Sequence, residues 1–257
     1  MRAKTRRRVG VQAVGRHACR HADGVAQVST PHLSASIMCA SLVSLEREIH
    51  ELEEAGLDLI HVDVMDAHFV PNLTFGTNVV EAIRSITSLP LHVHLMVADP
   101  GFFAAPMAEA GCNVYIFHLE AERYPFRLLD RVRELGMSPG VALNPATPVE
   151  LAQGLDVEHL LVMTVEPGFA GQRWLAGSER RVARARRLMP ASTVIGVDGN
   201  VSKTNAVRAM RAGASLLVCG TSSLFGTGLD YRSAIHELRA SLAASTQGTP
   251  TKRHKSG

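Results

Sequence analysis

The chain has 257 residues, of which 46% are hydrophobic and 20% charged, a composition that supplies a large core and excludes a wholly disordered chain, a collagen-like chain and a small disulfide-stapled scaffold. Its net charge of +3 comes from the ends, because 1–30 holds seven basic residues and one acidic residue, and 245–257 holds three basic residues and no acidic one. The body, 31–244, has 17 basic and 23 acidic residues, which argues against a nucleic-acid-binding domain, and its apolar runs are too short to cross a bilayer.

The two ends are predicted to lie outside the folded body. We interpret 1–30 as a basic, disordered extension, with a mitochondrial transit peptide as the alternative. The segment 245–257 is rich in Thr, Ser, Gly and Lys and is predicted to be a disordered tail. The four cysteines form no C-x-x-C pair and follow no hydrophobic signal peptide, which favours a reduced, cytoplasmic protein.

Between the ends, short apolar runs alternate with longer amphipathic segments. The apolar runs are rich in Val, Ile and Leu, which is typical of buried β-strands. The predicted strands are 33–38, 58–64, 90–96, 113–118, 139–143, 159–164, 193–198 and 215–219. The helices with the clearest spacing are 44–55, 179–189, 203–211 and 230–243.

The segment 44–55 has the pattern of a helix with one apolar face. Leu45, Ile49 and Leu52 fall on that face, and Leu42 is predicted to face inward on the same side. Alanine–glycine pairs at 55–56, 110–111 and 212–213 mark predicted helix ends, because glycine readily adopts the left-handed conformation that terminates many helices.

The pattern amounts to eight strand–helix units in the body. Repeated units of this kind predict a parallel sheet, and eight of them favour a closed (β/α)8 barrel. A doubly wound open sheet is the alternative, but no G-x-G-x-x-G follows the first strand. In a barrel, the chemistry lies at the carboxyl ends of the strands.

Polar side chains gather in three of the predicted strands. His61 and Asp63 are two residues apart in one strand, so both side chains point to the same face. A hydrogen-bonded structural pair would explain them alone, but His94 ends the next strand and Asp198 ends the seventh. Two histidines and two aspartates at a barrel mouth would suit Zn2+, Mn2+ or Fe2+. Such an ion beside a carboxylate base is suited to proton transfer next to a carbonyl.

Glycine-rich segments follow the last three predicted strands. Backbone N–H groups in such loops bind anions, and the loops after strands seven and eight of a barrel are a usual phosphate position. The segments are Gly168-Phe169-Ala170-Gly171-Gln172, Gly199-Asn200 and Gly220-Thr221-Ser222-Ser223, the last with a short helix predicted at 222–224. Together they predict a phosphate-binding site.

At these motifs the chain resembles the ribulose-phosphate 3-epimerase family, over about 33–243. The matching segments are SIM at 36–38, HVDVMDAHFVPN at 61–72, HLMV at 94–97, ALNPATP at 142–148, VMTVEPGFAGQ at 162–172, VDGN at 197–200 and CGTSSLF at 219–225. The resemblance implies a single (β/α)8 TIM barrel of the ribulose-phosphate-binding type. It also implies metal-dependent interconversion of D-ribulose 5-phosphate and D-xylulose 5-phosphate by proton transfer at C3, a step of the pentose phosphate pathway.

The resemblance also assigns roles to individual residues. The implied ligands of a divalent ion (Zn2+, with Fe2+, Mn2+ or Co2+ as alternatives) are His61, Asp63, His94 and Asp198, and the two aspartates are also the implied acid/base pair. The implied contacts to substrate or its phosphate are Ser36, His94, Gly168, Phe169, Ala170, Gly171, Gly199, Gly220 and Thr221. Phe169 would sit on a loop that closes over the substrate. Three methionines are implied to line the site, although core packing would also explain them: Met65, Met96 and Met163.

The chain departs from the family pattern at several positions. Ala67 replaces a usual glycine, and its methyl group would strain or shift the loop. His92 replaces a usual aspartate and would either alter the support of the metal or add a competing ligand. Gly196 replaces a usual glutamate, Asn200 replaces a glycine of the phosphate turn, and 40–41 replace a small residue and an aspartate. Because all four ligand positions are kept, we expect activity, with substrate choice open.

Three other functions compete with this interpretation. An allulose-6-phosphate 3-epimerase would use the same chemistry on a six-carbon substrate, and 36–39 resemble that branch at least as well. A decarboxylase or aldolase of a related barrel would carry Asp-x-Lys-x-x-Asp where this chain has 92–97. A non-catalytic sugar-phosphate-binding barrel would not need both carboxylates.

His118 and Glu120 either border the site or play a structural role. The expected partners are a ketose phosphate and further copies of the chain, with no nucleic acid and no membrane.

Overall fold

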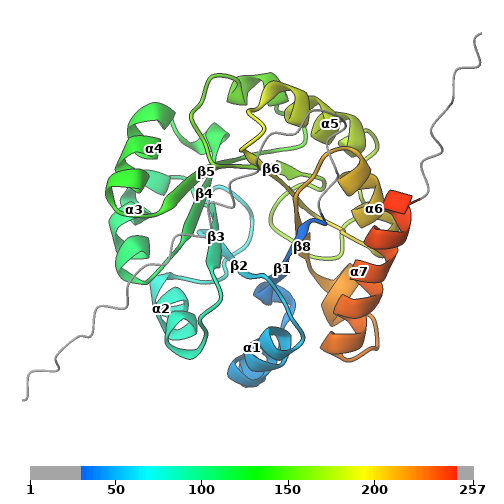
Figure 1. Ribbon diagram of the computed structural model, residues 1–257. Helices are drawn as coiled ribbons and strands as arrows, with labels where there is room; N and C mark the ends of the chain where they lie inside the picture. The colour runs from blue at the N-terminus through cyan, green and yellow to red at the C-terminus, as the bar shows by residue number, and fades with distance from the viewer. Residues whose placement is uncertain (1–29, 248–257) are drawn as a thin grey trace, which may run out of the picture.

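The structure, a computed structural model, describes residues 30–247. Eight parallel strands follow one another in chain order and close into a barrel, with the helices around the outside (Figure 1). The predicted (β/α)8 barrel is therefore confirmed. The strands are β1 (His32–Ser36), β2 (Leu59–Met65), β3 (Leu91–Met96), β4 (Val114–His118), β5 (Ser138–Leu143), β6 (His159–Met163), β7 (Val194–Asp198) and β8 (Leu216–Cys219).

Seven α-helices pack against the outside of the barrel within the described residues. They are α1 (Leu45–Glu54), α2 (Thr77–Ile86), α3 (Pro100–Glu109), α4 (Pro125–Glu134), α5 (Ser178–Leu188), α6 (Lys203–Arg211) and α7 (Tyr231–Gln247). The predicted alanine–glycine stops are confirmed, since Gly56, Gly111 and Gly213 have φ values of 83°, 92° and 105° directly after α1, α3 and α6. No described helix is both long enough and apolar enough to pass through a membrane.

The side chains of each strand alternate between two cores. One set faces the helices and forms the large outer core, to which Ile60, Val62 and Val64 of β2 belong. The other set faces the barrel axis, where a smaller apolar cluster includes Leu59, Ile116 and Leu161. His61 and Asp63 share the parity of Leu59, so the same alternation that buries Leu59 turns both polar side chains inward.

Three details of the predicted pattern were wrong. The connection between β5 and β6 carries a 3-10 turn, Val149–Ala152, in place of an α-helix, so only seven of the eight units contain one. Leu42 is 64% exposed, because it lies in a separate 3-10 turn (Leu42–Ser44) before α1 and does not continue the helical face. The helix predicted to end at 243 continues through Ser245 to Gln247. The rest of the predicted extension and tail, 1–29 and 248–257, lies outside the described residues.

The loop after β2 carries the strain that the alanine at position 67 was predicted to introduce. Ala67 has a φ of 59°, in the left-handed region that L-residues with a side chain avoid. Asp66 holds the loop in place, because its carboxylate accepts hydrogen bonds from the backbone N–H groups of His68, Phe69 and Ala98. The loop is thus fixed around an alanine in a conformation that glycine adopts freely.

We expect Ala67→Gly to raise the free energy of unfolding by about 0.5–1 kcal/mol. Glycine removes a left-handed strain of roughly 1–2 kcal/mol, and the greater freedom of the unfolded chain takes back roughly 0.4–1 kcal/mol. Urea denaturation of the two proteins measures the difference. The matched control is Ala55→Gly, where φ is −74° and the same substitution should destabilise the protein. A destabilised Ala67→Gly protein would contradict the prediction.

A candidate metal centre and its pocket

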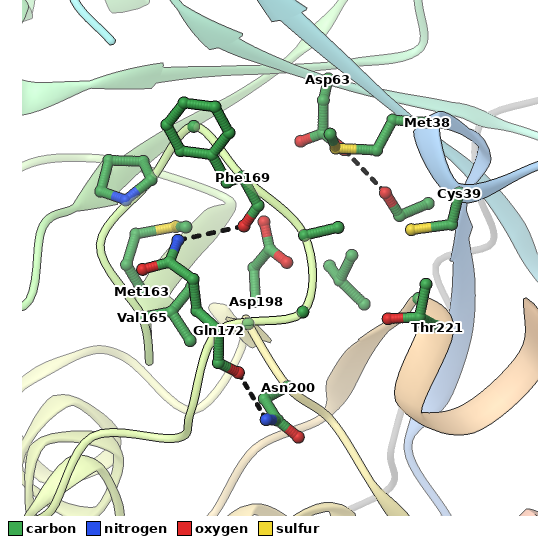
Figure 2. A pocket seen from close by; sticks show the side chains of 18 of the residues that line it. Met38, Cys39, Asp63, Met163, Val165, Phe169, Gln172, Asp198, Asn200 and Thr221 are labelled. Carbon is green, nitrogen blue, oxygen red and sulfur yellow. Dashed lines mark hydrogen bonds between the residues drawn. The ribbon is translucent and has the colours of Figure 1, made fainter. Parts of the chain in front are cut away.

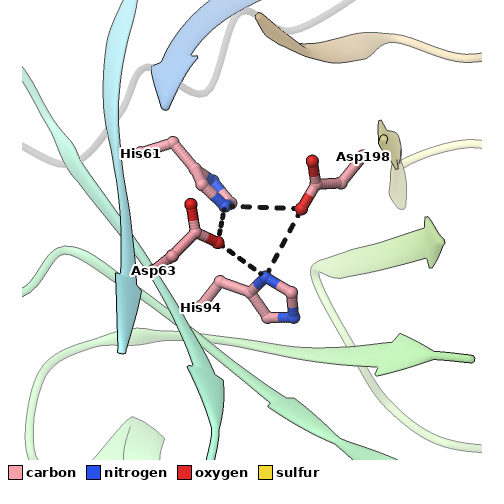
Figure 3. Close-up of side chains that lie close together, drawn as sticks. All are labelled: His61, Asp63, His94 and Asp198. Atoms are coloured by element: carbon pink, nitrogen blue, oxygen red, sulfur yellow. Dashed lines mark hydrogen bonds and ion pairs between the residues drawn. The ribbon is translucent and has the colours of Figure 1, made fainter. Parts of the chain in front are cut away.

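Four side chains from three strands meet inside the mouth of the barrel. They are His61 and Asp63 of β2, His94 of β3 and Asp198 of β7 (Figure 3). The register of the sheet places Asp63 beside His94, and closure of the barrel brings Asp198 across to both. One ligand atom from each residue lies within 4.8 Å of all the others. The structure therefore brings together the four residues that the sequence predicted.

The atoms that face one another at this cluster are ring nitrogens and carboxylate oxygens. His61 Nε2 lies 3.0 Å from Asp63 Oδ1 and 3.8 Å from Asp198 Oδ2. His94 Nδ1 lies 3.2 Å from Asp63 Oδ1 and 3.5 Å from Asp198 Oδ2. The second oxygen of Asp63, Oδ2, accepts a hydrogen bond from Ser36 Oγ at 2.7 Å.

Burial makes the charges of this cluster strongly interdependent. His61, Asp63 and His94 are almost completely buried, and the Asp198 side chain is 17% exposed. Burial opposes the ionisation of Asp63, but His61 and His94 outweigh it and lower the pKa of the carboxyl. Burial also opposes protonation of His94, but Asp198 and Asp63 raise the pKa of its imidazole to about 9. The two carboxylates thus create a buried site that attracts positive charge.

This donor set fits a divalent cation. Two imidazole nitrogens and two carboxylate oxygens match the ligand chemistry of Zn2+, Fe2+, Mn2+ and Co2+. Each histidine already presents one ring nitrogen to both carboxylates, so a cation between the four side chains would replace repulsion between the acids by attraction to both.

His92 lies beside the four-residue cluster and is not part of it. Its Nδ1 is 2.7 Å from His61 Nδ1, the ring nitrogen that faces away from Asp63 and Asp198. Of the two predicted effects of this departure, the geometry favours altered support of a ligand over a competing ligand. Burial lowers the pKa of His92 well below its usual value, so the ring is neutral.

A pocket opens above the cluster at the carboxyl ends of the strands (Figure 2). Its walls include both acids, the three predicted methionines and, except for His94, every residue predicted to contact the substrate or its phosphate. These predicted residues are Ser36, Asp63, Met65, Met96, Met163, Gly168, Phe169, Ala170, Gly171, Asp198, Gly199, Gly220 and Thr221. The predicted ligands His61 and His94 do not line the pocket, because they lie beneath its floor.

Side-chain amides tie together the loops around the pocket. Asn72 of the loop after β2 donates to the carbonyl of Gly168 at 2.7 Å, and Gln172 Nε2 donates to the carbonyl of Phe169 at 3.0 Å. Asn200 Nδ2 donates to the carbonyl of Gln172 at 2.5 Å (Figure 2). Phe169, which also lines the pocket, is 54% exposed.

The turn after β7 explains two of the unusual residues near the predicted phosphate site. Gly199 has a φ of 112°, and a Cβ there would lie 2.5 Å from a methyl carbon of Val165, so only glycine fits. Asn200 follows with a φ of 47°, which asparagine tolerates better than most residues. The replacement of a glycine by Asn200 is therefore mild, as predicted.

The structure adds pocket residues that the sequence did not single out. Met38, Cys39 and Val165 all line the walls. Met38 and Cys39 follow Ser36 in the 3-10 turn Ile37–Cys39, and their position after a strand end was a usable signal. At 40–41, where the chain also departs from the family pattern, the backbone N–H of Ser41 donates a hydrogen bond to the Glu48 carboxylate at 3.2 Å.

Side chains from the two neighbouring strands fill the space beside Gly196. A Cβ on Gly196 would lie 2.9 Å from Leu161 Cδ1 and 3.3 Å from Leu216 Cδ2. These two leucines occupy the space that the glutamate usual in the resembling family would need.

Comparison with known proteins agrees with the family resemblance seen in the sequence. The model of the Ribulose-phosphate 3 epimerase family matches residues 32–225. A ribulose-phosphate 3-epimerase of Bacillus subtilis is 40% identical over 215 residues, which cover 81% of this chain and 98% of that protein. One of Methanocaldococcus jannaschii is 39% identical over 230 residues, which cover 87% and 97%. A solved orotidine 5'-phosphate decarboxylase from Pyrococcus horikoshii OT3 has a TM-score of 0.60 at 14% identity, covering 82% of this chain and 99% of that one, and shares the fold alone.

Proposed function

We propose that this chain, which belongs to the ribulose-phosphate 3 epimerase family, interconverts D-ribulose 5-phosphate and D-xylulose 5-phosphate. The observation that carries the proposal is the pair of carboxylates, Asp63 and Asp198, which line one pocket from strands that are not neighbours in the barrel. Epimerisation at C3 needs a proton to leave one face of the carbon and another to arrive on the opposite face. Two separate carboxyl groups can do both without moving the substrate.

In this reaction one carboxylate would remove the C3 proton and the other, as a carboxylic acid, would deliver a proton to the opposite face. The direction of the reaction decides which aspartate does which. Asp63 is held by Ser36 through one oxygen and faces both histidines through the other. Asp198 is the more accessible of the two, with 17% of its side chain exposed to the pocket side.

We propose His61, Asp63, His94 and Asp198 as the ligands of a divalent ion, with Zn2+ as the first candidate and Fe2+, Mn2+ and Co2+ as alternatives. Bound there, such an ion supplies positive charge that stabilises the negative charge developing on the substrate's ketone oxygen. The two imidazoles are themselves buried and out of contact with bulk water.

The glycine-rich loops are proposed to hold the phosphate. Residues of these loops line the pocket at Gly168–Gly171, at Gly199 and at 220–222, where the turn Thr221–Phe225 begins. That turn is a single π-type turn, in place of the short helix predicted at 222–224. The proposed anchor therefore relies on backbone N–H groups of several loops and not on one helix end. Phe169, at the rim, is proposed to cover the bound substrate.

The proposal is tested by following ribulose 5-phosphate and allulose 6-phosphate side by side in D2O, with and without a chelator, by NMR. We expect chelator-sensitive incorporation of deuterium at C3 and faster turnover of the pentose. Faster turnover of the hexose would keep the chemistry and replace the substrate. No exchange with either sugar after Zn2+, Mn2+ or Fe2+ is supplied would leave a non-catalytic binding protein as the better explanation.

We also propose that the chain forms a homo-oligomer. An apolar groove lies between α2 and the start of α1, and the exposed side chains of Leu42 and Leu73 line it. Exposed apolar side chains that gather at one groove are more typical of an interface than of a free surface. Light scattering on the purified chain measures the number of subunits.

A cytoplasmic location is proposed from the cysteines. Among the described residues, Cys39, Cys112 and Cys219 form no disulfide, as expected in a reducing compartment. The alternative of an organellar transit peptide concerns 1–30, and localisation of a tagged full-length chain distinguishes the two.

A further inference from the structure

The two ligand imidazoles face the candidate metal centre through different ring nitrogens. His61 turns Nε2 towards Asp63 and Asp198, whereas His94 turns Nδ1 towards them. A neutral imidazole binds a metal through its unprotonated nitrogen and carries its proton on the other one. Each ring must therefore be held in a different tautomer, and the hydrogen bond at the outward nitrogen selects it.

A second buried histidine meets the outward nitrogen of each ring. His92 Nδ1 lies 2.7 Å from His61 Nδ1, and His118 Nε2 lies 2.9 Å from His94 Nε2. An ion bound to a ligand histidine takes the place of a proton on its binding nitrogen, so in the metal-bound protein each pair consists of two neutral rings, in which one nitrogen must donate and the other accept. If His94 is to bind an ion through Nδ1, its Nε2–H must donate and His118 Nε2 must accept, which leaves the proton of His118 on Nδ1.

A carboxylate lies where that proton points. His118 Nδ1 is 3.3 Å from Glu120 Oε2, and the Glu120 side chain is 23% exposed. The other oxygen of Glu120, Oε1, accepts hydrogen bonds from the backbone N–H of Asn144 at 2.7 Å and from the Thr147 hydroxyl. Burial opposes the ionisation of Glu120, but these hydrogen bonds and that of His118 lower its pKa to about 2. Glu120 is thus an ionised acceptor at neutral pH.

The loop that holds Glu120 is itself fixed by a helix. Arg181 of α5 donates through Nη2 to the carbonyls of Asn144 and Thr147, at 2.7 and 3.0 Å. The chain of contacts therefore runs from α5 through the loop after β5 to Glu120, to His118 and on to His94. If His94 binds an ion through Nδ1, this requirement fixes the donor in both histidine contacts, from His94 Nε2 to His118 and from His118 Nδ1 to Glu120.

We propose that His118 and Glu120 are positioning residues that fix His94 in the tautomer that leaves Nδ1 free to bind the metal ion. This inference rests on the proposed metal centre. Neither residue lines the pocket or belongs to the four-residue cluster, so their action passes through His94.

The same contacts predict that the two ligand histidines are supported unequally. Behind His61, the ring of His92 lies beside His159, with 5.7 Å between the ring centroids, and His159 Nδ1 has no hydrogen-bond partner among the described residues. No carboxylate forms a hydrogen bond or an ion pair with His92 in the described part of the chain. The hydrogen bonds behind His94, in contrast, end on the carboxylate of Glu120. Because of this difference, His118 and Glu120 are better residues than His92 for testing whether a ligand histidine is held in one tautomer.

The test measures Co2+ affinity of the metal-free full-length protein by competition with a chromogenic chelator, together with the visible spectrum of the Co2+ complex. His118→Phe removes the acceptor for His94, and Glu120→Gln removes the charge but keeps the shape. We expect Co2+ affinity to fall about 10–100-fold in His118→Phe and about tenfold in Glu120→Gln, with shifted Co2+ bands. His118→Gln should regain part of the affinity, because its amide oxygen can accept the His94 proton.

The matched control is Glu53→Gln on α1. Glu53 is also a partly exposed carboxylate that accepts two side-chain hydrogen bonds, from Thr87 and Ser88, each at 3.0 Å. The Glu53→Gln protein should bind Co2+ with the same affinity as the unchanged protein. If the unchanged protein binds Co2+ and both His118→Phe and Glu120→Gln bind it equally well, positioning is refuted and the metal centre stands. If the unchanged protein does not bind Co2+, the metal centre and the positioning pair both fail.

Discussion

Replacing Asp198 by asparagine should lower kcat for epimerisation at least about 1,000-fold while the barrel stays folded. The change removes one of the two carboxyl groups that move the C3 proton, a contribution of roughly 10²–10⁴-fold, and weakens a metal ligand as well. Asparagine has nearly the same shape, and the Asp198 side chain faces the pocket rather than the apolar core. A coupled assay gives kcat, and thermal unfolding followed by circular dichroism reports the fold.

The control for this substitution is Asp156→Asn, at an aspartate whose side chain is 96% exposed and pairs with Arg133 on the outside of the barrel. It should leave kcat unchanged. In D2O, Asp198→Asn should also exchange the C3 proton of one epimer faster than that of the other, since one carboxylate remains on one face. An Asp198→Asn enzyme within tenfold of the normal kcat would exclude the assigned acid/base role.

Removal of divalent metal should abolish the activity, with a fall of more than about 100-fold in kcat after dialysis against a chelator. Without a cation, the buried centre keeps two carboxylates within 4.8 Å of each other and nothing stabilises the charge on the substrate's ketone oxygen. Readdition of Zn2+, Mn2+, Fe2+ or Co2+ one at a time should restore activity and identify the ion that serves best. Full activity in the presence of chelator, with metal content checked by elemental analysis, would contradict the prediction.

Metal removal and readdition should also change the stability of the folded protein. An ion that binds the folded chain and not the unfolded one should stabilise it by about 2.7 kcal/mol at a concentration 100 times its Kd. The melting temperature should therefore rise with metal concentration. His94→Gln, which removes one ligand nitrogen from the centre, should reduce this rise without removing the barrel strands around it.

Much of the fold followed from local pattern. Val-, Ile- and Leu-rich runs located all eight strands to within two residues at each end, because a strand buried on both faces needs a continuous apolar sequence. The pattern was less reliable for helices. Leu42 has helical spacing to Ile49 but lies in a separate turn, and the connection after β5 carries a 3-10 turn, Val149–Ala152, in place of an α-helix. In both cases the spacing of apolar residues did not distinguish a short 3-10 turn from an α-helix.

By itself, the sequence determined that this protein has a parallel barrel and that His61 and Asp63 point into it, because strand alternation is a property of a few neighbouring residues. It also determined which four side chains could form a metal centre. Only the tertiary structure decided that Asp198 reaches His61 and His94 across the closed barrel, which ring nitrogen each histidine presents, and that His92, His118 and Glu120 stand behind them. These contacts join residues up to 137 positions apart, from Asp198 to His61, and such distances are set by closure of the sheet rather than by local sequence.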